Sequence, residues 1–207
     1  MKALLLIDIQ NDFLPGGALA VPDGDAVIPI CNRLQNKFEL VIATQDWHPQ
    51  DHKSFAVNHR DKKEFETITW NGLPQVLWPV HCVQNTRGAE FHPDLIDDIH
   101  IRTISKGLGD EDCYSAFDGT DLALQLHRLG VEEIWVGGLA TDYCVKSTVL
   151  EGLKEGFQVK VIEDAIRPVE LQPGDGERAL EEMRVAGAEI VPSSEFQVSS
   201  SQSAAAK

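Results

Sequence analysis

A chain of 207 residues is long enough to bury a substantial hydrophobic core within one domain of ordinary size. Asp and Glu number 33 against 18 Lys and Arg, which gives a formal net charge of −15 at pH 7. Proteins that bind nucleic acids or anionic membranes need a basic surface, so this charge argues against both classes of partner. It leaves self-association into a homo-oligomer open.

The first predicted strand, residues 3–8, is an apolar run that Asp8 interrupts. This run is shorter than the core of a signal peptide, and no run in the sequence approaches the length of a membrane span. The four cysteines are widely spaced and form no CxxC pair. We therefore expect reduced thiols in a cytoplasmic protein.

Near-continuous hydrophobic runs recur along the chain and are typical of strands buried on both faces of a parallel sheet. These runs are residues 3–8, 39–46, 101–105, 132–137, 158–164 and 188–192. Helical patterns lie between them at residues 25–38, 120–130, 141–156 and 174–187. Three of the helices end at a glycine, as helices commonly do (Gly130, Gly156 and Gly187). The alternation predicts an α/β fold with three αβα layers around a mostly parallel six-stranded sheet.

Two stretches depart from this alternation. Residues 47–99 show little periodicity and are rich in His, Trp, Pro and Asn, and a loop region of that length is usually functional. Residues 198–207 are of low complexity, and we expect them to be a disordered tail. The sequence thus predicts a single domain over residues 1–197.

Ionisable residues follow the predicted strands at the edge where parallel sheets bind ligands. Asp8 closes the first strand, Asp46 and His48 follow the second, and Lys106 follows the third. The segment 138–144 follows the fourth. We therefore expect these groups to meet at one edge of the sheet.

Cys144 is the candidate nucleophile. If Thr141 caps the following helix, Cys144 occupies the third helical position, where free N–H groups and the helix dipole favour a thiolate. The N–H groups of Ala140 and Cys144 could then converge on a developing oxyanion. The alternative is an unreactive core thiol, since free cysteine is among the most buried residue types.

Asp8 and Lys106 bear on this choice, because a buried carboxylate or ammonium is costly unless it is paired. If both approach Cys144, Asp8 can accept the thiol proton while Lys106 stabilises the thiolate. The alternative is a structural Asp8–Lys106 ion pair beside a bystander cysteine.

Histidines and an aspartate in residues 46–81 suggest a metal site. Asp46 and His48 are two positions apart, which places both side chains on one face of an extended chain. His81 comes later, and His52 is either a further ligand or a hydrogen-bond partner of one. One carboxylate with imidazoles suits a single divalent ion, with Zn favoured and Fe or Mn also fitting. The alternative is a group of ordinary polar histidines.

Several motifs occur together in one order along the chain. They are IDIQNDFLPGGALAV at 7–21, TQDWHP at 44–49, HKSF at 52–55, WPVHC at 78–82, SKG at 105–107, YSAF at 114–117 and GLATDYCV at 138–145. On these motifs the sequence resembles the nicotinamidase/pyrazinamidase enzymes of the isochorismatase-like cysteine hydrolases, over about residues 2–192. Isochorismatases proper lack the nucleophilic cysteine, so Cys144 separates this chain from them.

The resemblance implies a role for each matching residue. It implies a catalytic triad of Asp8, Lys106 and Cys144, and an oxyanion hole formed by Ala140 and Cys144. It implies metal ligands at Asp46, His48 and His81, with His52 as a further candidate, and a cis peptide at Leu139–Ala140. It implies a substrate pocket that includes Phe13, Leu19, Trp78, Tyr114 and Tyr143, although some relatives carry histidine at the last position.

The activity that the resemblance implies is hydrolysis of nicotinamide, and of its analogue pyrazinamide, through a cysteine thioester in NAD salvage. The small-molecule partner is then an amide. Two alternatives remain at this point. One is a related amidase for another small amide, such as an N-carbamoyl compound or a ureide. The other is a non-enzymatic metal or redox module, which leaves Asp8 and Lys106 without a role. A dinucleotide site is weaker still, because GxGxxG is absent.

Overall fold

The computed structural model describes residues 1–96, 101–110 and 113–198. The tail that the sequence predicts to be disordered, residues 198–207, lies outside these ranges apart from its first residue. Within the described residues, no helix combines the length and the apolar character that crossing a membrane requires.

Six strands form the central sheet in the order β5-β2-β1-β6-β7-β8, and each neighbouring pair is parallel. Their bounds are β1 (Lys2–Ile7), β2 (Leu40–Asp46), β5 (Arg102–Lys106), β6 (Glu133–Leu139), β7 (Gln158–Arg167) and β8 (Glu189–Val191). The six predicted strands are confirmed, with ends that shift by up to three residues. The chain first builds outward from β1 to β2 and β5, and then crosses back to place β6 on the other side of β1.

The α-helices are α1 (Ile28–Gln35), α2 (Leu122–Arg128), α3 (Lys146–Lys154), α4 (Asp175–Ala186) and α5 (Glu195–Val198). The 3-10 turns are η1 (Asn11–Phe13), η2 (Gly24–Val27), η3 (Ala56–Asn58) and η4 (Arg87–Ala89), and η5 (Thr141–Val145) is a π-helical turn. The predicted helical regions are confirmed. Gly130, Gly156 and Gly187 follow α2, α3 and α4, and each has the left-handed φ that ends a helix.

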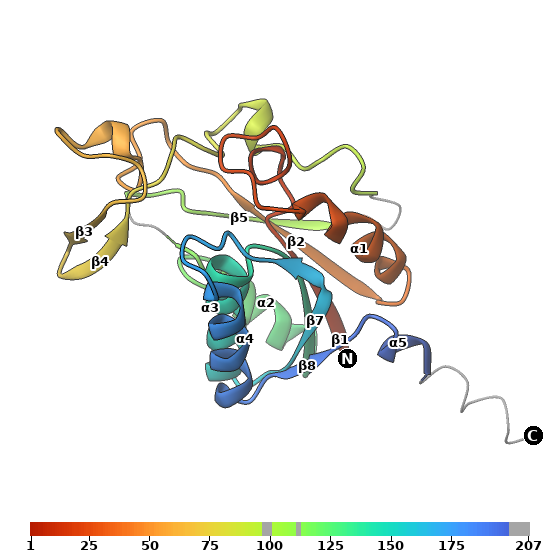
Figure 1. Cartoon of the computed structure of the whole chain (residues 1–207). Helices are drawn as coiled ribbons and strands as arrows, with labels where there is room; N and C mark the ends of the chain where they lie inside the picture. The colour runs from red at the N-terminus through yellow and green to blue at the C-terminus, as the bar shows by residue number, and fades with distance from the viewer. Residues whose placement is uncertain (97–100, 111–112, 199–207) are drawn as a thin grey trace, which may run out of the picture.

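The side chains of β1 alternate between two hydrophobic cores, one on each face of the sheet. Leu4 and Leu6 pack with residues of α1, whereas Leu5 and Ile7 pack with residues of α2, α3 and α4. Figure 1 shows α1 apart from the neighbouring α3 and α4. Because both faces of β1 are buried, its sequence is a continuous apolar run rather than an alternating one. The three-layer αβα prediction is therefore confirmed.

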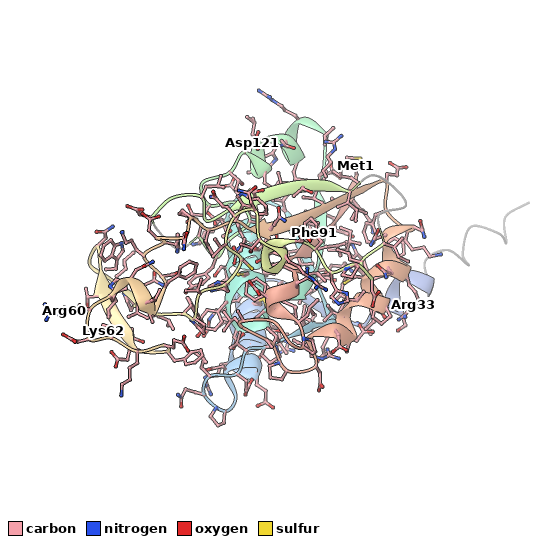
Figure 2. The ribbon with its side chains drawn as sticks, turned by 90° about the horizontal axis from the view of Figure 1, so that it is seen from above. Met1, Arg33, Arg60, Lys62, Phe91 and Asp121 are labelled. Carbon is pink, nitrogen blue, oxygen red and sulfur yellow. The ribbon has the colours of Figure 1, made fainter. Side chains whose placement is uncertain are left out.

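Residues 47–99 contain a small antiparallel hairpin that the sequence analysis did not identify. It consists of β3 (Thr67–Trp70) and β4 (Leu73–Val76), joined by Asn71 and Gly72. Both turn residues have positive φ (49° and 82°), the conformation for which Asn-Gly is preferred in two-residue hairpins. Figure 1 shows the hairpin projecting from the body of the molecule. In Figure 2, Arg60 and Lys62 mark this projecting end, opposite the side on which Arg33 of α1 lies.

Candidate active site

The structure brings the predicted catalytic residues together at the carboxyl ends of four strands. Asp8 follows β1, Asp46 ends β2, Lys106 ends β5, and Cys144 lies in the turn after β6. Strands β2 and β5 are added on one side of β1, and strands β6 to β8 on the other side. Open α/β sheets bind their ligands at such a point, where the order of the strands reverses. All four side chains are buried, so their charges act in a medium that screens them weakly.

Lys106 is the centre of this cluster. Its Nζ lies 3.0 Å from Asp8 Oδ2, 2.5 Å from Asp46 Oδ1 and 3.4 Å from Cys144 Sγ. Nζ also donates to the carbonyl of Cys113 at 3.2 Å. One buried ammonium therefore contacts the candidate base, a candidate metal ligand and the candidate nucleophile, and its pairing with two carboxylates offsets the cost of its burial.

The protonation of the cluster follows from burial and from these charges. Burial alone lowers the pKa of Lys106, but Asp46 and Asp8 reverse this and hold it well above its usual value. Burial raises the pKa of Asp8, and Lys106 opposes that rise. Burial also raises the pKa of Cys144 well above its usual value, although Lys106 lowers it. The expectation that the helix start favours a resting thiolate is therefore wrong for these residues, because burial outweighs the nearby positive charge.

A thiol that rests protonated needs a proton acceptor when it attacks, and Asp8 is placed for this role. Sγ of Cys144 and one carboxylate oxygen each of Asp8 and Asp46 all lie within 4.8 Å of one another. Thr44 donates to Asp8 Oδ1 at 2.6 Å and accepts the Asp8 N–H at 3.1 Å, which fixes the carboxylate. The geometry can thus transfer the thiol proton to Asp8 without a histidine.

The turn that carries Cys144 differs from the predicted helix start. Ala140 is the residue before the turn, and its carbonyl accepts the N–H groups of Tyr143 and Val145. The cap predicted at Thr141 is wrong, because η5 is a wider π-helical turn that begins at Thr141 itself. The Thr141 hydroxyl is buried and has no hydrogen-bond partner among the described residues. Cys144 is therefore the fourth residue of the turn. The cis peptide predicted at Leu139–Ala140 is present.

Three buried side chains form a set that could hold a metal ion. Ligand atoms of Asp46, His48 and His81 all lie within 4.8 Å of one another. Nδ1 of His48 lies 3.0 Å from the Gly107 carbonyl, and Nδ1 of His81 lies 2.8 Å from the Pro79 carbonyl. When each Nδ1–H donates to its carbonyl, each Nε2 offers a lone pair, which is the arrangement usual for histidine ligands. One carboxylate and two imidazoles in this arrangement fit a divalent ion.

Gly107 supports this set without contributing a ligand. It has a φ of 65°, and a Cβ at this position would lie 2.4 Å from Cε1 of His48. Only glycine allows the chain to follow the imidazole ring so closely and to present its carbonyl to Nδ1. The SKG motif thus combines the lysine of the catalytic cluster with a contact to the metal set.

His52 lies beside the three converging side chains and is not one of them. Its ring packs on that of His48, with 4.2 Å between the centroids, and its Nδ1 lies 2.8 Å from Ser54 Oγ. Among the described residues, the groups whose ligand atoms converge with Asp46 do not include His52. This placement favours a supporting role beside His48 over ligation, and the contact between the two residues is ring packing.

A small cavity opens directly on Cys144. All five predicted pocket residues line it, together with catalytic and metal-set residues and Val169: Phe13, Leu19, Asp46, Trp78, His81, Tyr114, Ala140, Tyr143, Cys144 and Val169. Trp78 Nε1 donates to the Tyr114 hydroxyl at 3.0 Å, and the rings of Trp78 and Tyr143 meet edge to face at 4.8 Å. The aromatic side chains in its walls are of the kind that bind a small planar ring.

The sequence analysis missed several residues that hold the site in place. Gln10 accepts the Asp46 N–H and donates to the Asp46 carbonyl, both at 2.8 Å, and is fully buried. Asp12 accepts the Cys82 N–H at 2.7 Å, which ties the loop that carries Phe13 to the segment after His81. The sequence signal for such residues was a polar side chain close to a predicted buried strand, because a buried polar group needs a hydrogen-bond partner.

The family model for the isochorismatase domain matches residues 2–195. The chain belongs to the isochorismatase family. It is 46% identical to a nicotinamidase of Escherichia coli over 200 residues, which cover 91% of this chain and 93% of that protein. The structure is also similar to two solved structures. One is a nicotinamidase/pyrazinamidase of Acinetobacter baumanii (TM-score 0.91, 44% identity, 94% and 97% of the two chains). The other is a pyrazinamidase of Pyrococcus horikoshii in complex with zinc (TM-score 0.78, 45% identity, 92% and 98%).

Proposed function

We propose that this chain hydrolyses nicotinamide to nicotinate and ammonia, and pyrazinamide by the same chemistry. The observation that carries the proposal is the position of Cys144, which lines an aromatic cavity while Asp8 and Lys106 lie behind it. The nicotinamidases and pyrazinamidases among its relatives match over nearly the whole chain. A hydrolase that acts on a carboxamide C–N bond accounts for every charged group in the buried cluster.

In the first half of the reaction, Cys144 Sγ attacks the carboxamide carbon and its proton passes to Asp8. Lys106 stabilises the sulfur while it carries charge, and it keeps Asp8 ionised beforehand. The negative charge on the former carbonyl oxygen is met by the backbone N–H groups of Ala140 and Cys144. The C–N bond then breaks, and the departing nitrogen takes the proton from Asp8 and leaves as ammonia.

In the second half, a water molecule attacks the thioester carbon and gives a proton to Asp8. The C–S bond breaks, nicotinate is released, and the thiol of Cys144 regains the proton. Phe13, Trp78 and Tyr143 hold the ring so that the carboxamide faces the sulfur, and their packing limits the access of other water. Each catalytic group returns to its starting protonation.

Asp46, His48 and His81 would hold the divalent ion, and we propose zinc, with iron or manganese as ions that the same ligands fit. When bound, the ion supplies an open coordination position for a ring nitrogen at the wall of the cavity. Asp46 also contacts Lys106, so the metal set and the catalytic cluster share one carboxylate. His52 packs against His48 and restrains its ring.

We also propose that the reaction serves NAD salvage and that the protein is cytoplasmic. All four cysteines are free thiols in the structure, which agrees with a reducing compartment. The substrate is a neutral small molecule, for which an acidic surface is no obstacle to binding.

Ammonia release by Cys144→Ala tests the function directly. We expect the purified wild-type protein to release ammonia from nicotinamide in preference to N-carbamoyl compounds and ureides. The variant should lose this activity while it keeps the fold, measured by circular dichroism, and the metal content. Turnover by the variant would refute the mechanism. A wild type that prefers another amide would refute the substrate. Hydrolysis that survives thiol alkylation would refute the cysteine mechanism, and the absence of amide hydrolysis would favour a non-enzymatic metal or redox module.

A further inference from the structure

Asp142 lies two residues before the nucleophile and has no part in the chemistry above. Its side chain reaches the segment after β7: Oδ1 accepts the Val169 N–H at 2.9 Å and Oδ2 accepts the Glu170 N–H at 3.0 Å. The residue is buried, with 7% of its surface exposed. Both carboxylate oxygens are thus committed to backbone N–H donors from one short segment 27 and 28 residues away.

That segment forms one wall of the cavity. Val169 lines the cavity together with Ala140, Tyr143 and Cys144, and its side chain packs against the core on the α1 face of the sheet. Another part of the cavity wall belongs to the turn that carries Asp142 itself, because Tyr143 is the next residue along the chain. Asp142 therefore joins two walls of the same cavity, one through its backbone and one through its carboxylate.

The segment has few other backbone anchors. Pro168 follows the end of β7 and has no N–H to donate. Glu170 adopts a left-handed φ of 61°, and its own carboxylate accepts the N–H groups of Gly174 and Gly176 at the start of α4. Asp142 on one side and α4 on the other therefore fix residues 168–170. Without the Asp142 carboxylate, the two N–H groups beside the cavity lose their acceptors.

We propose that Asp142 is a positioning residue that sets the width of the substrate cavity by holding Val169 at a fixed distance from the nucleophile turn. It acts on the aromatic ring through Val169 and does not touch the reacting atoms. This inference rests on the proposed function and deepens it, because it names a determinant of ring binding that is separate from Asp8, Lys106 and Cys144. Charge-assisted hydrogen bonds suit this role, since they are shorter and more directional than neutral ones.

A purely structural role would be shared by other carboxylates that accept two hydrogen bonds, and the half-buried Asp164 is the control. Asp164 lies on β7, where its carboxylate accepts the Ser193 N–H at 2.7 Å and the Ser193 hydroxyl at 2.6 Å. It therefore makes the same number of bonds to a distant loop, but it does not line the cavity. Variants at the two positions separate loss of stability from loss of ring binding.

The experiment compares steady-state kinetics on nicotinamide for Asp142→Asn, Val169→Ala, the double variant and Asp164→Asn. Asn keeps the size of the side chain but replaces one acceptor oxygen by a donor. We expect KM to rise about tenfold in Asp142→Asn and kcat to stay within about twofold, because binding contacts are lost and the catalytic groups are not. Val169→Ala should raise KM similarly. The KM of the double variant should not exceed the higher of the two single-variant KM values. Asp164→Asn should lower Tm without changing KM.

Three results would overturn the inference: an unchanged KM in Asp142→Asn, KM effects of Asp142 and Val169 that multiply, or an equal rise of KM in Asp164→Asn. If Asp142→Asn does not fold, Asp142→Glu takes its place, since the longer carboxylate keeps the charge and displaces the segment. A rise of KM supports the inference there too, and an unchanged KM refutes it. Wild-type turnover is measured first: its absence refutes the proposed function, whereas normal turnover with unchanged KM in the variants refutes only the role of Asp142.

Discussion

Gly107→Ala should weaken metal binding although residue 107 is not a ligand. The substitution places a Cβ 2.4 Å from His48 Cε1 and 2.6 Å from its Nδ1, whereas ordinary contact begins at 3.4 Å. The imidazole must therefore move from 2.4 Å to at least 3.4 Å, a displacement of about 1 Å. Metal–nitrogen distances tolerate only about 0.2 Å. The left-handed φ of 65° adds about 1–2 kcal/mol of backbone strain for alanine.

Loss of a supporting contact of this kind lowers metal affinity about 10- to 100-fold, and we expect at least that for Gly107→Ala. The assay is zinc affinity by competition with a chromophoric chelator, with metal content per chain measured in parallel. Gly109→Ala is the matched control, because a Cβ at that position meets nothing within 4 Å. If Gly107→Ala binds zinc as tightly as Gly109→Ala, then His48 is not a ligand or its ring is not held by residue 107.

Three further predictions follow from the buried contacts. Thr44→Val removes the donor to Asp8, which should destabilise the fold by about 1–3 kcal/mol. It should also raise the pKa of Asp8 further, so that the acid limb of the kcat/KM profile moves to higher pH; an unmoved limb would argue against Asp8 as the base. Burial raises the pKa of Cys31 to about 12, so at pH 8 only about one thiol in ten thousand is ionised and iodoacetamide should label it far more slowly than in urea. Its labelling, followed by peptide mass spectrometry, should rise about tenfold per pH unit, and a rate independent of pH would contradict this. Gly138→Ala places a Cβ 2.1 Å from the Ile7 carbonyl oxygen inside the sheet and should cost about 3 kcal/mol or more in urea unfolding. Gly156→Ala, with open space around it, should cost only about 1–2 kcal/mol, and equal losses would show that the close approach does not matter.

The parallel sheet could be predicted because strands buried on both faces leave a local signature, as the apolar run of β1 shows. The order of the strands could not, since no local pattern records that β6 returns to pair with β1. The β3–β4 hairpin was missed because its residues are mostly exposed or half-buried, which leaves no strong hydrophobic pattern. Its Asn-Gly turn was the remaining signal.

Most of the catalytic and metal sets could be predicted because the residues follow strands whose carboxyl ends share one edge of the parallel sheet. His81 lies in the loop region 47–99, and its own motif indicated it. The resting state of Cys144 could not, because its pKa depends on how deeply the fold buries it. Asp142 and Gln10 were missed for a related reason. Their partners lie 27 or more residues away in sequence, so the need for a carboxylate or an amide appears only when the chain is folded. The roles assigned to the site residues remain predictions that the variants above test.

Because of the strand order, the ribosome synthesises one half of the site before the other half. Everything that β1, β2 and β5 contribute, from the proton acceptor to the metal set, lies in the first 106 residues. The sulfur, the oxyanion donors and the wall at Val169 come from the strands added on the other side of β1. A nascent chain therefore carries the ammonium and the two carboxylates before it carries a nucleophile, until β6 pairs along β1 from Lys2 to Ile7. Enzymatic activity can then serve as a readout of that single pairing, and a chain cut between the two halves should recover it only when both fragments reassemble.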